Sequence, residues 1–235
     1  KSNRKLKFLY TNADQYVNKR DTLLAMIAEG EPDVILITEV IPEGQVNPIA
    51  IASIHINGYK LHTYFKPENS NLGSSGIRGV MLYSKISLKA FEVDVKVDGH
   101  RDHAWIQIPG DNGESLLCGC IYRSPSDSDQ IASLESTRKI INLLKAAYEI
   151  NPNVLIAGDF NFKEIDWVND FVPPRKVYLN EFISTLHECF LYQHVTEPTR
   201  FREGEQPNLL DLILSNEEDM VQDLSYLPPL DKSDH

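Results

Sequence analysis

The sequence predicts one four-layer α/β sandwich, in which two mixed, mostly antiparallel β-sheets pack face to face and helices cover both outer sides. Three observations support this fold class. Strand–helix units occur in each half of the chain, the region between them reads as consecutive antiparallel strands, and no repeat or linker interrupts the 235 residues. We therefore expect a single domain over residues 1–235.

The first unit is a strand, a helix and a second strand. An alternating stretch ends at Asn12, and Asn18 is the expected N-cap of the helix. Gly30 closes that helix, and the proline two residues later prevents its continuation. A purely aliphatic run then forms a central strand that leads to Glu39. Two strands joined in this way deliver Asn12 and Glu39 to the same edge of a sheet.

The middle third is expected to be antiparallel β-structure, reached through a surface excursion over residues 41–57. Asp111-Asn112-Gly113 is a strong hairpin signal between the last two of its strands. The expected strands cover residues 59–65, 79–84, 88–95, 104–108 and 115–122.

The second half returns to alternating helices and strands. Ser128 or Asp129 is the expected cap of a helix whose core face runs from Ile131 to Ala147. A second helix is expected over residues 179–189. The remaining strands are expected from residue 154 into Gly158, and over residues 192–195, 209–214 and 221–227.

The most informative stretch is the end of the strand that begins at Val154. The strand runs into Gly158, and Asp159 and Asn161 follow it two residues apart. The carboxyl ends of strands are where α/β sheets usually hold their chemistry. A carboxylate beside an amide suits a metal-assisted phosphate site, although an ordinary Asp/Asn turn after a strand has the same pattern.

A carboxylate inside an apolar strand is the second unusual feature. Asp211 lies in Leu-Leu-Asp-Leu-Ile-Leu, where burial without a partner is costly. An edge position or a bond to nearby backbone would satisfy it, and so would a histidine that Asp211 orients. His235 is the candidate for that histidine. A core or surface role is expected for His55, His62, His100, His103, His187 and His194.

Glu39 offers a hard oxygen ligand at a strand end, which suits Mg²⁺ with water and phosphate completing the coordination shell. No histidine or cysteine spacing indicates zinc. The sequence also lacks the glycine motifs of nucleoside-triphosphate and dinucleotide sites, and the nucleophile elbow of serine hydrolases.

Composition narrows the class of partner. The formal net charge of −11 argues against nucleic-acid binding through a broadly basic surface, while small basic groups leave local contacts open. Cys118, Cys120 and Cys189 are expected to be reduced and mostly buried, as in a cytosolic or nuclear protein. No apolar run reaches the length of a membrane span and no secretory signal is visible, so we expect no membrane association.

Six motifs follow one another along nearly the whole chain: Asn12, Glu39, Tyr122-Arg123, Gly158-Asp159-Phe160-Asn161, Leu210-Asp211 and Ser233-Asp234-His235. Together they resemble the endonuclease/exonuclease/phosphatase superfamily. Within it, the chain looks most like the endonuclease domain of non-LTR (LINE-type) retrotransposons, as in Tyr10-Thr11-Asn12-Ala13-Asp14 and Glu197-Pro198-Thr199-Arg200. Apurinic-site enzymes usually have Gln-Glu-Thr-Lys where this chain has Thr38-Glu39-Val40-Ile41.

The resemblance implies the four-layer fold and a Mg²⁺-dependent phosphoester hydrolase site, with Mn²⁺ as a second suitable ion. Glu39 would bind the metal, with Asn12 close beside it and Asp234 supporting the metal side. Asp159 would orient or deprotonate the attacking water.

The other implied roles concern the phosphate and the DNA. Asn161 and Tyr122 would hold and polarise the scissile phosphate. Asp211 would orient His235, which would hydrogen-bond or protonate the developing phosphorane oxygen. Substrate contacts are expected from Thr199, Arg200, Arg202 and Arg123, with solvated loop charges as the alternative for Arg200 and Arg202. Target specificity is expected to lie in loops at residues 69–76, 162–176 and 199–206.

The function implied by the resemblance is nicking of target DNA to leave a 3′-hydroxyl that primes reverse transcription of a retrotransposon. The expected partners are double-stranded DNA and a covalently linked reverse transcriptase domain. The domain is expected to act as a monomer in the nucleus, after synthesis in the cytoplasm. The alternatives are a phosphatase acting on an inositol lipid or sphingolipid, an apurinic-site endonuclease, and a catalytically silent binding module.

One departure from the family pattern concerns the C-terminal motif. In the family a further strand follows Ser-Asp-His, whereas this sequence stops at His235. We therefore expect a domain excised from a larger polyprotein that lacks the final strand, with reduced stability or activity if the polypeptide ends there.

Overall fold

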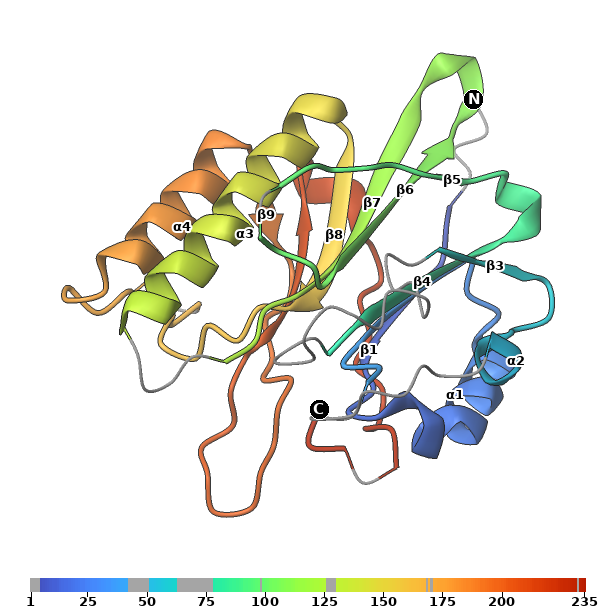
Figure 1. The fold of residues 1–235 in the computed structure, drawn as a ribbon, viewed down its shortest axis with the longest axis horizontal. Helices are drawn as coiled ribbons and strands as arrows, with labels where there is room; N and C mark the ends of the chain where they lie inside the picture. Colours follow the sequence, from blue (N-terminus) through green and yellow to red (C-terminus); the bar gives the residue numbers. More distant parts are fainter. Residues whose placement is uncertain are drawn as a thin grey trace.

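Two β-sheets packed face to face form the centre of the molecule, and helices cover both outer sides (Figure 1). This computed structural model describes residues 5–41, 51–62, 78–97, 99–125, 130–167, 169, 171–231 and 233–235. The predicted loop at residues 69–76, most of the excursion after residue 41 and the cap at Ser128 or Asp129 lie outside the described residues. The predicted fold class is confirmed.

The first sheet has the strand order β1-β2-β4-β3. Its parallel pair is β1 (Phe8–Asn12) and β2 (Val34–Thr38), joined by helix α1 (Tyr16–Gly30), as the sequence predicts. The antiparallel strands are β3 (Tyr59–His62) and β4 (Val80–Lys85). The short helix α2 (Ile51–Ile54) lies on the same outer side as α1 (Figure 1).

The second sheet has the strand order β5-β6-β7-β8-β10-β9, in which β7 and β8 are parallel and every other pair is antiparallel. Its strands are β5 (Phe91–Glu92), β6 (His103–Pro109), β7 (Ser115–Tyr122), β8 (Val154–Asp159), β9 (Tyr192–Gln193) and β10 (Asp211–Ser215). Helices α3 (Gln130–Ile150) and α4 (Val177–Glu188) cover its outer face (Figure 1). The 3₁₀ turns are η1 (Ile86–Leu88), η2 (Asp111–Gly113) and η3 (Glu218–Met220).

Three buried clusters fill the three spaces between the four layers. In β2, Ile35 and Ile37 face the α1 side, whereas Val34 and Leu36 face the second sheet. This two-sided burial explains why the strand is an uninterrupted aliphatic run, since alternate residues enter different cores. Strand β8 is buried on both faces in the same way.

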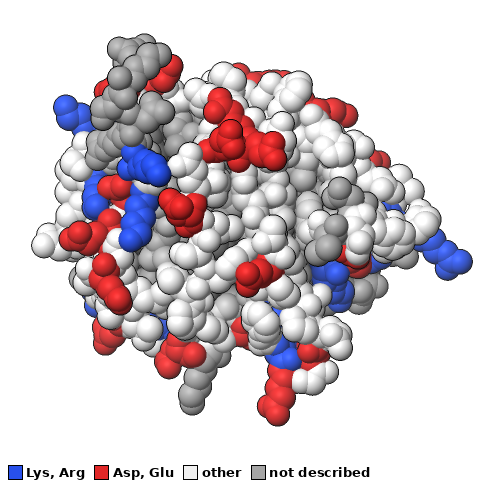
Figure 2. All heavy atoms as spheres, turned by 180° about the vertical axis from the view of Figure 1, so that it is seen from behind, with Lys and Arg blue, Asp and Glu red and all other residues white. Residues whose placement is uncertain are grey.

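Charged residues do not form one continuous basic surface on the face shown in Figure 2, where lysines and arginines are scattered among acidic residues. Among the described residues, no helix has the length and apolar character needed to cross a membrane. Cys118, Cys120 and Cys189 are free thiols and buried.

Residues 221–227 form no strand, which corrects the sequence prediction. Leu224, Tyr226 and Leu227 are exposed, because this segment has no sheet partner to cover its alternating apolar residues. The Tyr226 hydroxyl oxygen instead accepts the backbone N–H of Thr196 at 3.0 Å.

Three smaller predictions are also wrong. Asn18 lies within α1, whose N-cap is Gln15, and Asn18 donates from Nδ2 to the Gln15 side chain at 3.2 Å. Within residues 88–95 only Phe91 and Glu92 pair as a strand, so β5 is short. Ile131 is 68% exposed and does not join the core face of α3.

Candidate active site

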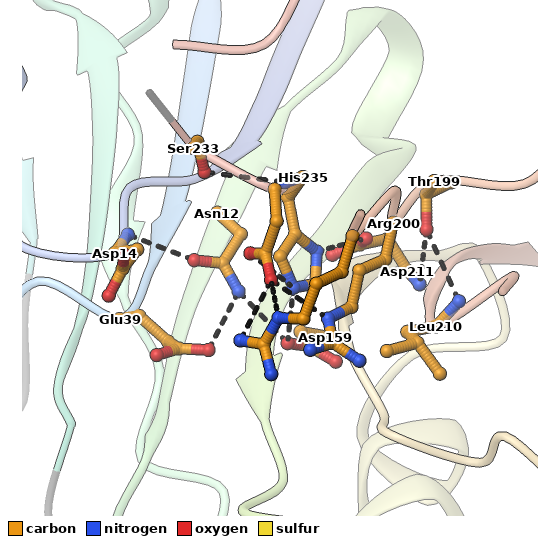
Figure 3. Close-up of polar contacts among 12 residues, drawn as sticks. Asn12, Asp14, Glu39, Asp159, Thr199, Arg200, Leu210, Asp211, Ser233 and His235 are labelled. Atoms are coloured by element: carbon orange, nitrogen blue, oxygen red, sulfur yellow. Dashed lines mark hydrogen bonds and ion pairs between the residues drawn. The ribbon is translucent and has the colours of Figure 1, made fainter. Parts of the chain in front are cut away.

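Four strand ends meet at one end of the packed sheets. Asn12 ends β1, Glu39 follows β2, Asp159 ends β8, and Asp211 begins β10. Because β10 runs antiparallel to β8, Asp211 lies directly opposite Asp159 in the strand register. These side chains converge with that of His235 (Figure 3).

Asn12 links the two sheets through its side-chain amide. Its Nδ2 atom donates to Oε1 of Glu39 and to Oδ2 of Asp159, both at 2.9 Å. Its Oδ1 atom accepts the backbone N–H of Asp14 at 3.0 Å. An N–H group does not coordinate a cation, so Asn12 here holds the two acids in place. Its predicted role as a metal ligand stays a prediction and requires the amide to turn over.

Asp159 is completely buried, and this burial raises the pKa of its carboxyl well above the ordinary value. The carboxylate of Asp211 raises the pKa further, as does that of Glu39. His235 and the backbone N–H of Asn161, 3.1 Å from Oδ1, act in the opposite direction. A carboxylate that is costly to keep charged has a raised proton affinity, which suits a group that accepts a proton from water.

His235 forms the predicted pair with Asp211, with Nδ1 2.8 Å from Oδ2. Burial lowers the pKa of the imidazole, but the carboxylates of Asp211, Asp159 and Asp234 outweigh it and raise the pKa to about 9. The ring is therefore an imidazolium at neutral pH, with Nδ1 donating to Asp211. Its second nitrogen, Nε2, lies 3.9 Å from Oδ2 of Asp159 and has a proton to donate to substrate.

Two further side chains hold Asp211. The Tyr10 hydroxyl donates to Oδ1 of Asp211 at 2.5 Å and lies 3.1 Å from the Thr38 hydroxyl. Burial and the nearby carboxylates raise the pKa of Tyr10, which keeps the hydroxyl protonated. Thr199 accepts the backbone N–H of Asp211 on its hydroxyl oxygen at 3.1 Å. The sequence did not indicate a role for Tyr10 in the site, because its place in an alternating strand indicates only a core aromatic residue. Substrate contact by Thr199 stays a prediction.

Glu39 is paired with a residue that the sequence analysis did not identify. The Arg78 guanidinium forms an ion pair with Oε2 of Glu39 and lies 3.3 Å from Oδ1 of Asp14. Its Nε atom donates to the carbonyl oxygen of Ile41 at 3.1 Å. A single arginine before a strand has no distinguishing pattern in the sequence. The φ angle of Glu39 is 51°, a left-handed conformation that is costly for this residue type and typical of functional sites.

Asp234 faces two arginines. Its Oδ2 atom accepts from Nε of Arg200 at 3.1 Å and from Nε of Arg202 at 3.1 Å. Partial burial raises the pKa of Asp234, but His235 and the two guanidinium groups lower it more, so the carboxyl stays ionised. Support of a metal by Asp234, and substrate contact by Arg200 and Arg202, stay predictions.

Tyr122 is buried at the end of β7. Its burial, together with the charges of Glu39 and Asp159, raises the pKa of the phenol, so the hydroxyl is a donor at neutral pH. This protonation state agrees with the role of polarising a phosphate oxygen, which stays a prediction for Tyr122 and Asn161.

The structure corrects one predicted substrate contact. Arg123 is 3% exposed, and its Nη1 atom donates to the carbonyl oxygens of Phe160 at 3.2 Å and Asn161 at 3.1 Å. Its guanidinium also lies over the Phe162 ring, 4.4 Å from the centroid. In return Nδ2 of Asn161 donates to the Arg123 carbonyl oxygen at 2.8 Å. Arg123 therefore shapes the turn that carries Asn161, because its burial leaves the side chain little access to a substrate.

The residues at this edge fit a divalent cation. Glu39, Asp159 and His235 each offer one ligand atom, and these atoms lie within 4.8 Å of one another. Carboxylate oxygens are the ligands that Mg²⁺ and Mn²⁺ prefer, so Glu39 and Asp159 are the fitting donors, whereas the protonated ring of His235 has no free nitrogen lone pair. A cation here would also offset the repulsion among the carboxylates that raises the pKa of Asp159. Of the predicted acidic ligands, Glu39 belongs to this group and Asp234 does not.

Comparisons with known proteins agree with this geometry. The model of the endonuclease/exonuclease/phosphatase family matches residues 7–235. No curated protein matches the chain in sequence.

Several solved structures share the fold at low sequence identity. The endonuclease domain of TRAS1, a telomere-specific non-LTR retrotransposon, has a TM-score of 0.63 and 15% identity, over 98% of this chain and 94% of that one. The AP endonuclease LMAP from Leishmania major has a TM-score of 0.64 and 14% identity, over 89% and 78% of the two chains. The 3′ phosphatase NExo from Neisseria, solved with a product DNA hairpin, has a TM-score of 0.63 and 14% identity, over 92% and 88%.

Proposed function

The chain belongs to the endonuclease/exonuclease/phosphatase family, and we propose that within this family of nucleases and phosphatases it is a divalent-metal-dependent endonuclease that nicks DNA. The proposal rests above all on one arrangement, in which Asp159 lies beside the imidazolium of His235 and Asp211 orients the ring from behind. This places a proton acceptor and a proton donor at the same strand edge, which hydrolysis of a phosphodiester requires.

Each side chain has a distinct part in this mechanism. Asp159 accepts a proton from the attacking water, and Asn12 fixes its orientation through the 2.9 Å hydrogen bond. His235 donates from Nε2 to the oxygen on which negative charge develops, while Asp211 keeps the ring in place. The hydroxyl of Tyr122 polarises a second phosphate oxygen. Glu39 and Asp159 would hold a divalent metal, which would neutralise negative charge on the phosphate and on the leaving oxygen.

DNA is proposed as the substrate because the chain is similar over 98% of its length to a retrotransposon endonuclease and has LINE-type motifs around Asn12 and Thr199. In that role the nick leaves a 3′-hydroxyl that primes reverse transcription. Mg²⁺ is the proposed ion, and Mn²⁺ a substitute. The proposal includes a covalently linked reverse transcriptase domain, a monomeric endonuclease and action on chromosomal DNA in the nucleus.

Nicking of supercoiled plasmid in Mg²⁺ tests the function. The expected result is conversion to the open circle by the wild-type protein, with ends that a polymerase extends without phosphatase treatment. Asp159→Ala and His235→Ala should both abolish nicking while the far-ultraviolet circular dichroism stays unchanged. Intact plasmid together with hydrolysis of an inositol phosphate or sphingomyelin would identify a phosphatase instead, and cutting confined to apurinic sites would identify a repair-type activity.

A further inference from the structure

Two arginines in the loop between β9 and β10 hold the segment that carries His235. Arg200 donates from Nε to Oδ2 of Asp234 at 3.1 Å. Arg202 donates to the same oxygen from Nε at 3.1 Å, and its Nη2 atom lies 3.0 Å away. The backbone N–H of Phe201, between the two arginines, donates to the carbonyl oxygen of Asp234 at 2.6 Å. Side chains and main chain therefore tie three consecutive loop residues to the neighbour of His235.

The two arginines are also balanced by acids. Besides Asp234, Glu205 lies 3.5 Å from Nη1 of Arg200 through one carboxylate oxygen and 3.7 Å from Nη1 of Arg202 through the other. Two guanidinium groups thus face two carboxylates, so the cluster has no formal excess of positive charge. Binding of DNA phosphates depends on uncompensated cations, which makes this cluster better suited to a structural contact than to phosphate binding.

The opposite side of the loop is attached to Asp211. Thr199 accepts the backbone N–H of Asp211 at 3.1 Å and that of Leu210 at 3.2 Å. Arg200 and Asn208 exchange backbone hydrogen bonds at 2.9 and 3.1 Å, which closes residues 199–208 into a hairpin. Figure 1 shows this hairpin, in orange, projecting beyond the sheet. It therefore connects Asp211 on one side with Asp234 on the other.

We propose that Arg200 and Arg202 are positioning residues that act through Asp234 to keep the imidazole of His235 against Asp211. The effect on rate rests on the proposed nuclease function, whereas the tethering of residues 233–235 concerns contacts within the chain alone. The paired contact needs arginine because Nε of each side chain donates to the carboxylate, and lysine has no donor at that position.

The first test keeps the charge and removes these donors. In the double variant Arg200→Lys/Arg202→Lys, kcat for plasmid nicking should fall about 10- to 100-fold while KM for DNA stays unchanged. Arg138→Lys is the matched control, since this arginine on α3 forms an exposed ion pair with Glu181 at 3.5 Å, and it should nick like the wild type. Full activity of the double lysine variant would overturn the proposal.

A mutant cycle tests whether the arginines act through Asp234. Adding the two lysine substitutions to Asp234→Ala should cause no further loss of kcat beyond that of Asp234→Ala alone, because both remove the same contact. Losses that multiply would contradict the proposal. The double variant Arg200→Gln/Arg202→Gln gives a second check. If the slope of log affinity for DNA against log salt concentration falls by about one phosphate contact for each arginine, the arginines bind phosphate and the proposal is contradicted.

Amide hydrogen exchange without DNA separates the tether from the nuclease function. The amide of Phe201 and the amides of residues 233–235 should exchange roughly tenfold faster or more in the double lysine variant than in the wild type. If the double lysine variant exchanges faster but the wild-type protein does not nick DNA, the tether is supported and the nuclease function is refuted. Unchanged exchange in a protein that nicks normally would refute the tether.

Discussion

Asp159 and Asp211 are direct cross-strand neighbours in the antiparallel pair β8–β10, and both are buried. Carboxylates in this position repel each other, which contributes to the raised pKa of Asp159. Different donors compensate each acid, with Asn12 at Asp159 and both Tyr10 and His235 at Asp211. The site therefore depends on donors that the two sheets and the C-terminal segment contribute together.

Tyr10→Phe is expected to reduce nicking about tenfold, because Asp211 loses the 2.5 Å hydrogen bond that fixes one of its oxygens. The free energy of unfolding should fall by only about 1–2 kcal/mol, since the ring keeps its packing. Steady-state nicking rates and urea unfolding measure the two effects. Tyr83→Phe is the matched control, because this buried hydroxyl contacts Ile54 and Met81, away from the site. Equal rate losses in both variants would contradict the role given to Tyr10.

The stability that His235 contributes should depend on pH. Its pKa in the folded protein is about 9, above the ordinary value of 6.5, so the contribution is complete below pH 6.5 and disappears as the pH rises through 9. The difference between these two pKa values corresponds to roughly 3 kcal/mol of folding stability. Urea unfolding of wild type and His235→Gln in a chelator should show a difference that shrinks over this range. A difference that is constant from about pH 6 to pH 10 would count against the imidazolium.

Arg78→Gln should strengthen metal binding roughly tenfold, because removing the guanidinium leaves the Glu39 carboxylate without its paired cation. Calorimetry or Mn²⁺ electron paramagnetic resonance measures the dissociation constant directly, without DNA. Arg20→Gln is the control, since Arg20 donates to the carbonyl oxygen of Ser53 and does not contact either acid. Unchanged or weaker metal binding in Arg78→Gln would mean that the arginine does not compete with the cation.

Gly158→Ala should destabilise the protein by about 3 kcal/mol or more, because overpacking against backbone allows little relief. A Cβ atom at this position would lie 1.9 Å from the Ile121 carbonyl oxygen in the neighbouring parallel strand. Gly30→Ala is the control, with its nearest atom at 3.8 Å, and it should be neutral or slightly stabilising. Chemical unfolding measures both, and a stable Gly158→Ala variant would contradict the close approach of β7 and β8.

Much of the fold could be predicted from the sequence because the two-sided strands β2 and β8 appear as unbroken aliphatic runs. The wrong strand prediction at residues 221–227 also comes from relying on local pattern. Alternating apolar residues such as Leu224 and Tyr226 look like a strand, but only a sheet edge within reach makes them one. Local pattern is therefore reliable where a core covers both faces and misleading where the partner strand is absent.

For the candidate site, the amino-acid pattern alone places Glu39, Asp159 and Asp211 at strand ends or inside apolar strands, where a charge needs a partner. It also indicated the pairing of Asp211 with His235. The other partners of these acids become visible once the two sheets are packed together. Tyr10 reaches Asp211 across 201 positions of sequence, because the two sheets pack face to face. Such contacts depend on how separate layers are stacked, and no periodicity within one segment records that arrangement.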